Sequence, residues 1–127
     1  MRTALPLLAV ALAAALAACG GAPDDASAED FCAAWTEGSG GSADGLHDRA
    51  AALEDAGTPA DVSTAARSGY EIFVEQAKPV DDADVAALDQ AAATPAGLAE
   101  VYGISEDEAA DVVAFFDYAN TTCPPGD

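Results

Sequence analysis

Helix start and stop signals divide the chain after residue 28 into short segments. The spacing of these signals limits the fold more than any other feature of the sequence. Within the segments, apolar residues recur at helical spacing: Leu46, Ala50 and Leu53 follow one another at i, i+4 and i+7. No stretch alternates strictly between apolar and polar residues, and β-branched residues are sparse. Short amphipathic helices must pack together to bury their apolar faces. We therefore expect an all-α fold, a small helical bundle of about four to six short helices.

The same signals indicate where the helices begin and end. Ser27, Thr58-Pro59 and Thr94-Pro95 are typical helix starts, because Ser or Thr caps an N-terminus and proline suits the first turn. Ser105 and Glu108 have the spacing of a capping box. We expect a first helix between Ser27 and the Gly/Ser-rich residues 38–42, followed by helices over about residues 43–56, 59–78, 82–93, 95–102 and 106–121.

Residues 4–18 form an uncharged, mostly apolar run behind the positive charge of Arg2. As a helix the run would be about 22 Å long, which is short of the ~30 Å hydrocarbon core of a membrane. It ends in Leu16-Ala17-Ala18-Cys19, which matches the lipobox at which bacterial signal peptidase cuts before a diacylglycerol-bearing cysteine. We expect Cys19 to be the lipidated first residue of the mature protein. An ordinary secretory signal with a chance cysteine is the alternative.

This cleavage would divide the chain into three parts. Residues 1–18 are expected to be a signal peptide, residues 19–28 a lipidated cysteine with a flexible tether, and residues 29–127 the helical domain. Two acyl chains anchor a protein stably where one chain is marginal. We therefore expect the protein at the cell membrane, lipid-anchored on its extracytoplasmic face.

Acidic side chains dominate the charge of the chain. There are 23 Asp and Glu against 4 Lys and Arg, which gives a formal net charge of -19. Such a chain repels the phosphates of nucleic acids and of anionic lipids. We therefore expect no nucleic-acid partner, and contact with the membrane only through the lipid anchor. Cationic partners are allowed by this charge, but it selects none of them.

Two cysteines, Cys32 and Cys123, remain if Cys19 is lipidated. They flank the whole helical domain, and disulfides persist outside the cytoplasm. One bridge between them is expected, and it would close a loop of about 90 residues worth at most about 4.6 kcal/mol in the chain-entropy model. A reactive or metal-binding thiol pair is the alternative, although no second histidine or CxxC motif accompanies the two cysteines.

The acidic clusters at residues 81–84 and 106–108 raise the question of a cation site. An EF-hand beginning at Asp82 would need an oxygen ligand and a glycine where Ala86 and Ala87 stand, so the motif fails. Both clusters fall in expected first turns of helices, where negative charge is favourable. His47 is the single histidine, and no catalytic signature accompanies it. We expect no catalytic residues, no metal site and no cofactor.

Eight aromatic residues follow Ser27, and at helical spacing they are expected mainly in the core. In the last helix, Phe116 is expected to lie on the buried face together with Ala109, Val112 and Val113. Phe115 and Tyr118 flank that face. We therefore expect one of them to be exposed and available as a partner surface.

The chain resembles the small actinobacterial lipoproteins of unknown function. The resemblance rests on the lipobox, on Phe31-Cys32 near the start of the domain, on the acidic, alanine-rich middle, and on Cys123 near the end. It covers the whole chain and implies an envelope location, a helical domain and one disulfide. It implies no catalytic residues.

These features favour a membrane-anchored, non-catalytic binding or interaction module with an unknown protein or small-molecule partner. A passive envelope component is the first alternative, and a cation-dependent enzyme is the second.

Overall fold

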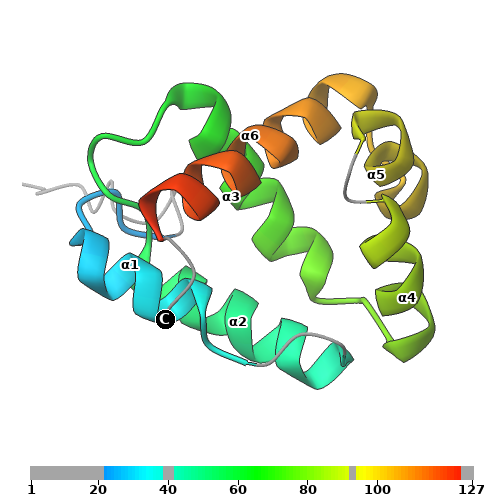
Figure 1. Ribbon diagram of the computed structural model, residues 1–127, viewed down its shortest axis with the longest axis horizontal. Coiled ribbons are helices and arrows are strands. Elements are labelled where there is room, and N and C mark those ends of the chain that lie inside the picture. The colour runs from blue at the N-terminus through cyan, green and yellow to red at the C-terminus, as the bar shows by residue number, and fades with distance from the viewer. Residues whose placement is uncertain (1–21, 39–41, 92–93, 124–127) are drawn as a thin grey trace, which may run out of the picture.

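The computed structural model describes residues 22–38, 42–91 and 94–123, and these residues form six helices and no strand (Figure 1). The expected all-α fold is confirmed. The expected signal peptide and Cys19 lie outside the described residues. The helices are α1 (Ala28–Trp35), α2 (Ala43–Ala56), α3 (Thr64–Ala77), α4 (Asp82–Ala91), α5 (Pro95–Tyr102) and α6 (Glu106–Thr122).

Helices α3 and α6 cross at the centre of the molecule and form its most extensive helix pair (Figure 1). Gly69 on α3 permits the close approach. A Cβ atom at this position would overlap the backbone carbonyl of Asp111 on α6 and would lie 2.7 Å from the amide nitrogen of Val112. The two backbones are therefore closer together here than any residue with a side chain would allow.

Two cores lie along this helix pair. The first core joins α1, α2, α3 and the C-terminal half of α6. It consists of Phe31, Ala34, Leu53, Tyr70, Phe73, Val74, Phe115, Ala119 and Cys123. The second core joins the start of α2, the end of α3, helices α4 and α5, and the N-terminal half of α6. It consists of Ala43, Val80, Val85, Leu88, Leu98, Ala109 and Val112.

The first core buries one hydroxyl group, and that group has a partner. The Tyr70 hydroxyl donates a hydrogen bond of 2.6 Å to the carbonyl oxygen of Leu53, which joins α3 to α2. Burial raises the pKa of Tyr70 to about 12, so the hydroxyl remains a donor at physiological pH. The polar atom is thus satisfied inside an otherwise apolar cluster.

The expected disulfide is present and joins Cys32 on α1 to Cys123 at the end of α6. The Cα atoms of the two cysteines are 5.3 Å apart, and 91 positions separate them in the sequence. The bridge holds the short helix α1 against the first core. Helix α1 has only 8 residues, too few to be stable by itself, so this attachment matters to its position.

Most of the expected helix starts are confirmed. Ser27, Thr94 and Ser105 each cap the helix that follows, and Ser105 forms the predicted capping box with Glu108. The expected start at Thr58-Pro59 is wrong, because α3 begins at Thr64 behind the cap residue Ser63. Thr58 is fully buried and is bound to other parts of the chain instead.

Those partners belong to the segment before α1. The Thr58 amide donates to the carbonyl oxygen of Pro23 at 3.0 Å, and the Thr58 carbonyl accepts from the Ala26 amide at 3.1 Å. Arg67 donates to the carbonyl oxygens of Ala22 and Pro23 at 2.7 and 2.8 Å, and to the Thr58 hydroxyl at 2.8 Å. Residues 22–26 are therefore fastened to the domain, which differs from the flexible tether expected up to residue 28.

The close approach of α3 and α6 predicts the effect of a single methyl group. We expect Gly69→Ala to lower the free energy of unfolding by about 1–3 kcal/mol, because the added Cβ must push α6 away. At an unconstrained helical site the same change would stabilise the protein. Urea denaturation followed by circular dichroism measures the difference. Ser68→Ala, at the neighbouring and partly exposed position, is the control and should change stability little. An alanine at position 69 that left stability intact would contradict the packing described here.

The disulfide gives a second prediction. We expect the double variant Cys32→Ser/Cys123→Ser to lose about 2–4 kcal/mol of unfolding free energy, because the unfolded chain regains the freedom that a long closed loop removes. Reduction of the unaltered protein should produce the same loss in urea denaturation. The double variant itself should not respond to reductant, and a further loss on its reduction would show that the effect has another source.

Candidate functional site

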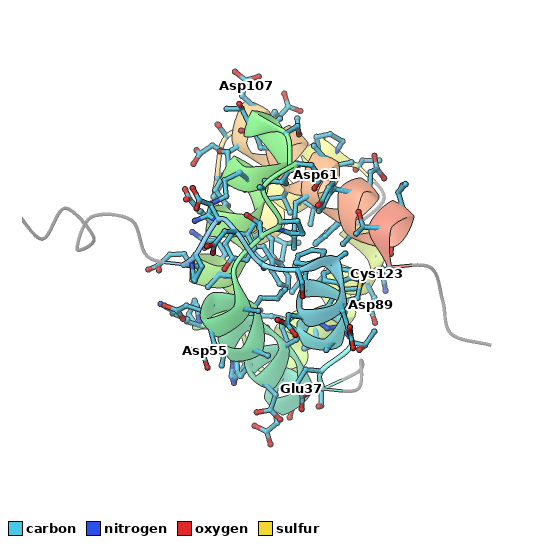
Figure 2. The ribbon with its side chains drawn as sticks, turned by 90° about the vertical axis from the view of Figure 1, so that its left-hand side faces the viewer. Glu37, Asp55, Asp61, Asp89, Asp107 and Cys123 are labelled. Atoms are coloured by element: carbon cyan, nitrogen blue, oxygen red, sulfur yellow. A yellow bond between two sulfur atoms is a disulfide. The ribbon has the colours of Figure 1, made fainter. Side chains whose placement is uncertain are left out.

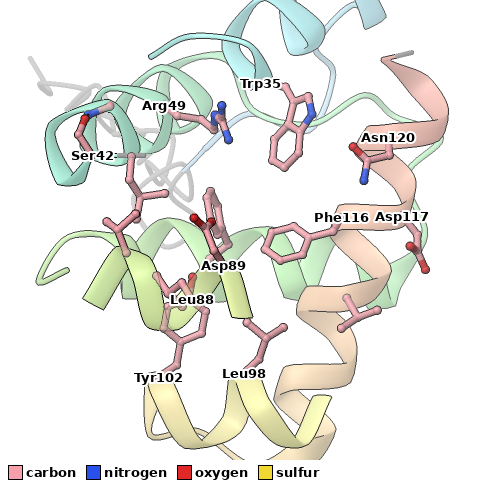
Figure 3. A pocket seen from close by; sticks show the side chains of 15 residues that line it. Trp35, Ser42, Arg49, Leu88, Asp89, Leu98, Tyr102, Phe116, Asp117 and Asn120 are labelled. Atoms are coloured by element: carbon pink, nitrogen blue, oxygen red, sulfur yellow. The ribbon is translucent and has the colours of Figure 1, made fainter. Parts of the chain in front are cut away.

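A hollow of about 460 Å³ opens between the two cores (Figure 3). All six helices contribute to its wall. The apolar part of the wall consists of Trp35, Leu46, Phe73, Val85, Leu88, Leu98, Tyr102, Val113 and Phe116. The remaining lining residues are Ser42, Gly45, Arg49, Asp89, Asp117 and Asn120. This size is within the ordinary range of small-molecule sites, about 300–1,000 Å³.

The hollow exists because the two cores meet without closing. Leu46 on α2 and Phe116 on α6 are only partly buried, and each packs against both cores. They form the seam between the cores, and the space beside them is not filled by any other side chain of the described residues. The cavity is thus a consequence of how α2 and α6 bridge the two clusters.

Three aromatic rings form one continuous part of the wall. The ring centroids of Phe73 and Phe116 are 5.6 Å apart, those of Trp35 and Phe116 are 6.1 Å apart, and those of Trp35 and Phe73 are 6.4 Å apart. Rings at these distances and tilts support one another and hold their orientation. The wall is therefore rigid and offers flat apolar faces to a bound molecule.

Among the described residues of the lining, Arg49 is the only basic one. Its guanidinium carbon lies 5.1 Å from the Trp35 ring centroid, a cation–π distance. Its Nε and Nη2 atoms make long hydrogen bonds of 3.4 and 3.3 Å to the carbonyl oxygens of Glu37 and Gly38. Burial lowers the pKa of Arg49 below its usual value, because loss of water disfavours the charged guanidinium.

The other polar groups of the lining differ in their exposure. Tyr102 is partly buried, and burial raises its pKa to about 12, so its hydroxyl stays neutral at physiological pH. Asp89, Asp117 and Asn120 are exposed. Figure 3 shows Asp89 on the wall that faces Arg49, whereas Asp117 is turned away from the hollow. The polar groups are therefore at the rim and the apolar groups at the floor.

The expectation of an exposed Phe115 is wrong. Phe115 is 0% exposed and lies at the middle of the first core. Its ring is next to those of Phe31, Trp35, Tyr70, Phe73 and Phe116. The reason is that the most buried face of α6 runs through Val112, Phe115 and Ala119, so the next residue, Phe116, turns about 100° away and reaches the cavity.

Tyr118 is partly buried rather than free. Its ring centroid lies 5.6 Å from that of Phe31, and its hydroxyl donates a hydrogen bond of 2.9 Å to Asp61. Burial, and after it this hydrogen bond, raises the pKa of Tyr118. Of the two aromatic residues expected as a partner surface, Phe115 is therefore part of the core. Tyr118 links α6 to the loop before α3.

The acidic clusters and His47 have structural partners. Asp82 accepts a hydrogen bond of 2.8 Å from the Ala43 amide at the start of α2, and Asp81 accepts one of 3.0 Å from the Asp84 amide. His47 Nε2 lies 2.8 Å from the Val80 carbonyl oxygen. Within residues 22–38, 42–91 and 94–123, no group of three His, Cys, Asp or Glu is arranged to hold a metal ion.

Exposed carboxylates are spread over the surface instead. Figure 2 shows the labelled side chains of Glu37, Asp55, Asp61 and Asp107 at separate places on the outside of the molecule. Their spread lowers the mutual repulsion of a strongly acidic chain. None of these four carboxylates lines the cavity.

The cavity itself was not foreseen from the sequence, but one signal for it was present. Arg49 lies on the apolar face of α2, three residues after Leu46 and four before Leu53. A charged residue on the buried face of a helix indicates either an internal ion pair or a polar site.

Within the described residues, none of the helices combines the length and the apolar character that a membrane span requires.

Comparisons of the chain with protein-family models, with curated proteins and with solved structures give no match.

Proposed function

We propose that this protein is a lipid-anchored, extracytoplasmic binding protein whose helical domain holds a small, largely apolar molecule between its two cores. The observation that carries the proposal is the hollow of about 460 Å³ with its wall of Trp35, Phe73 and Phe116. Protein interiors are normally filled. An open, aromatic-walled space with a few polar groups at its rim is what small-molecule sites have in common.

The chemistry of the lining supports binding rather than catalysis. The described lining contains no histidine or cysteine, and burial raises the pKa of its Tyr102 hydroxyl to about 12. A general base needs a pKa near the working pH and a partner within hydrogen-bond reach. The Tyr102 hydroxyl does not meet the first condition, whereas the polar groups at the rim can orient a ligand.

The lipobox and the fastened N-terminal segment support a position close to the membrane. Cys19 is three residues before Ala22, which Arg67 holds on the domain. An extended chain spans at most about 11 Å over three residues. A lipid on Cys19 would therefore keep the domain next to the bilayer, where apolar molecules are concentrated.

A neutral apolar dye tests the cavity. We expect N-phenyl-1-naphthylamine to bind saturably and to accept energy from Trp35, the single tryptophan of the chain, which lines the cavity. Val113→Phe should weaken binding at least about tenfold, because the larger ring occupies the ligand space. Fluorescence titration in the Cys19→Ala background measures the dye affinity with Val113 and with Val113→Phe.

The matched control is Ala110→Phe, which adds a phenyl ring to the exposed side of the same helix and should leave dye binding unchanged. Thermal melting of both variants shows that each is folded. Equal dye binding by the unaltered chain and the folded Val113→Phe variant would overturn the assignment of the cavity.

The anchor is tested separately in bacterial cells. We expect the native protein to begin at Cys19, to carry acyl mass there and to sediment with membranes, whereas the Cys19→Ala variant should carry no acyl mass and should keep residues 1–18 uncleaved. Mass spectrometry of the N-terminal peptide and cell fractionation are the measurements. A native N-terminus elsewhere, or a cysteine without acyl mass, would remove the membrane part of the proposal.

A further inference from the structure

We infer that the ligand of the cavity is an amphiphile with one carboxylate, whose apolar body lies against the aromatic wall and whose carboxylate pairs with Arg49. The inference rests on the proposed function and adds the chemical class of the ligand. It is carried by the position of Arg49 at the rim of the hollow and by the absence of a counter-ion for this side chain within the described residues.

The other described Arg and Lys side chains each have a carboxylate partner, unlike Arg49. Arg67 forms an ion pair of 3.1 Å with Glu71, and Lys78 forms ion pairs of 3.4 and 3.8 Å with Glu75 and Glu54. In the part of the chain that the structure describes, Arg49 is the one Lys or Arg side chain with no carboxylate within 4.0 Å, although the chain has 23 Asp and Glu. Acidic side chains are abundant, yet none of the described ones comes within 4.0 Å of this guanidinium, and Asp89, which faces it across the hollow, is exposed (Figure 3).

The geometry leaves Arg49 able to bind an anion. Its guanidinium is held over Trp35 at 5.1 Å, and its two hydrogen bonds use Nε and Nη2 at 3.4 and 3.3 Å, which is long for a charged donor. Neither of these two hydrogen bonds uses Nη1. A planar guanidinium with free donors suits a carboxylate, which accepts two parallel hydrogen bonds. The group is also partly buried, so water screens such a pair less than it screens a pair on the surface.

The carboxylates at the rim of the hollow, those of Asp89 and Asp117, would favour a cationic ligand, but their positions argue against one. Asp117 is exposed and turned away from the hollow, and Asp89 is exposed, so water hydrates and screens both charges (Figure 3). A cation would also seek the face of an aromatic ring. At Trp35, that role already belongs to Arg49. The one charge that lies partly out of water is therefore positive, and it selects an anion.

Three amphiphiles with alkyl chains of nearly equal length and different head groups provide the test: decanoate, decanol and decyltrimethylammonium. Each displaces N-phenyl-1-naphthylamine from the chain with Cys19→Ala, at concentrations below its critical micelle concentration. We expect decanoate to bind tightest. Arg49→Gln should weaken decanoate at least about tenfold, the loss of one charge-assisted pair, and should leave decanol unchanged.

Two further variants separate charge from packing. Lys78→Gln removes the same charge outside the cavity and should leave decanoate binding unchanged. Arg49→Lys keeps the charge but loses the planar guanidinium, and should bind decanoate with intermediate affinity. Decanol binding by each Arg49 variant shows that the cavity is intact, so a misfolded variant cannot be mistaken for a lost ion pair.

Each result separates this inference from the proposed function. If the dye and decanol bind but Arg49→Gln does not weaken the binding of decanoate, the carboxylate inference is wrong and the proposal of a binding cavity remains. If decyltrimethylammonium binds tightest, the rim carboxylates select the ligand and the inference is overturned. If neither the dye nor any of the three amphiphiles binds, the proposed function fails together with it.

Discussion

The contact between the backbones of α3 and α6 at Gly69 is the constraint on which the rest of the structure depends. At that level the two helices leave no space for a side chain between them. Their large residues must pack to the sides, as Tyr70 does against α2 through the Leu53 carbonyl. Helices α1 and α2 then cover one end of the α3–α6 pair, and α4 and α5 cover the other (Figure 1). Two cores result, because one pair of crossed helices offers two separate apolar flanks.

A cavity between two cores is stable only if its walls cannot collapse into it. Aromatic rings provide that resistance here, since Phe73 and Phe116 are large, rigid and supported by their neighbours. The Cys32–Cys123 bridge fixes α1, and with it Trp35, at the edge of the hollow. The unfilled volume loses packing energy that a filled core would keep. Retaining it at the junction of all the helices is easier to explain by binding than by stability.

Apart from the Cys32–Cys123 bridge, the sequence predicted what local chemistry determines and missed what distant contacts determine. Ser27 and Ser105 cap helices because each side chain meets an amide three residues ahead, whatever the rest of the fold does. Thr58 carries the same signal, but its hydroxyl accepts from Arg67 and its backbone pairs with residues 23 and 26, so tertiary contacts override it. Phe115 and Phe116 are adjacent on the helix, and only the placement of α3 decides which of them is buried. The cavity lies outside sequence reasoning for the same reason, because it depends on how helices that are far apart in the chain face one another.

Three basic side chains in the described part of this acidic chain have three different surroundings, and the differences are informative. Lys78 is exposed between two glutamates, where an ion pair contributes little. Arg67 stacks over Tyr70 at 5.0 Å and holds residues 22 and 23, so its charge organises the entry of the chain into the domain. Arg49 has an aromatic ring and two backbone carbonyls but no anion. A partly buried cation without a counter-ion is costly, and a sequence with so many acids could have supplied one from almost any neighbouring position. The missing anion is therefore better assigned to the proposed ligand than to the described part of the protein.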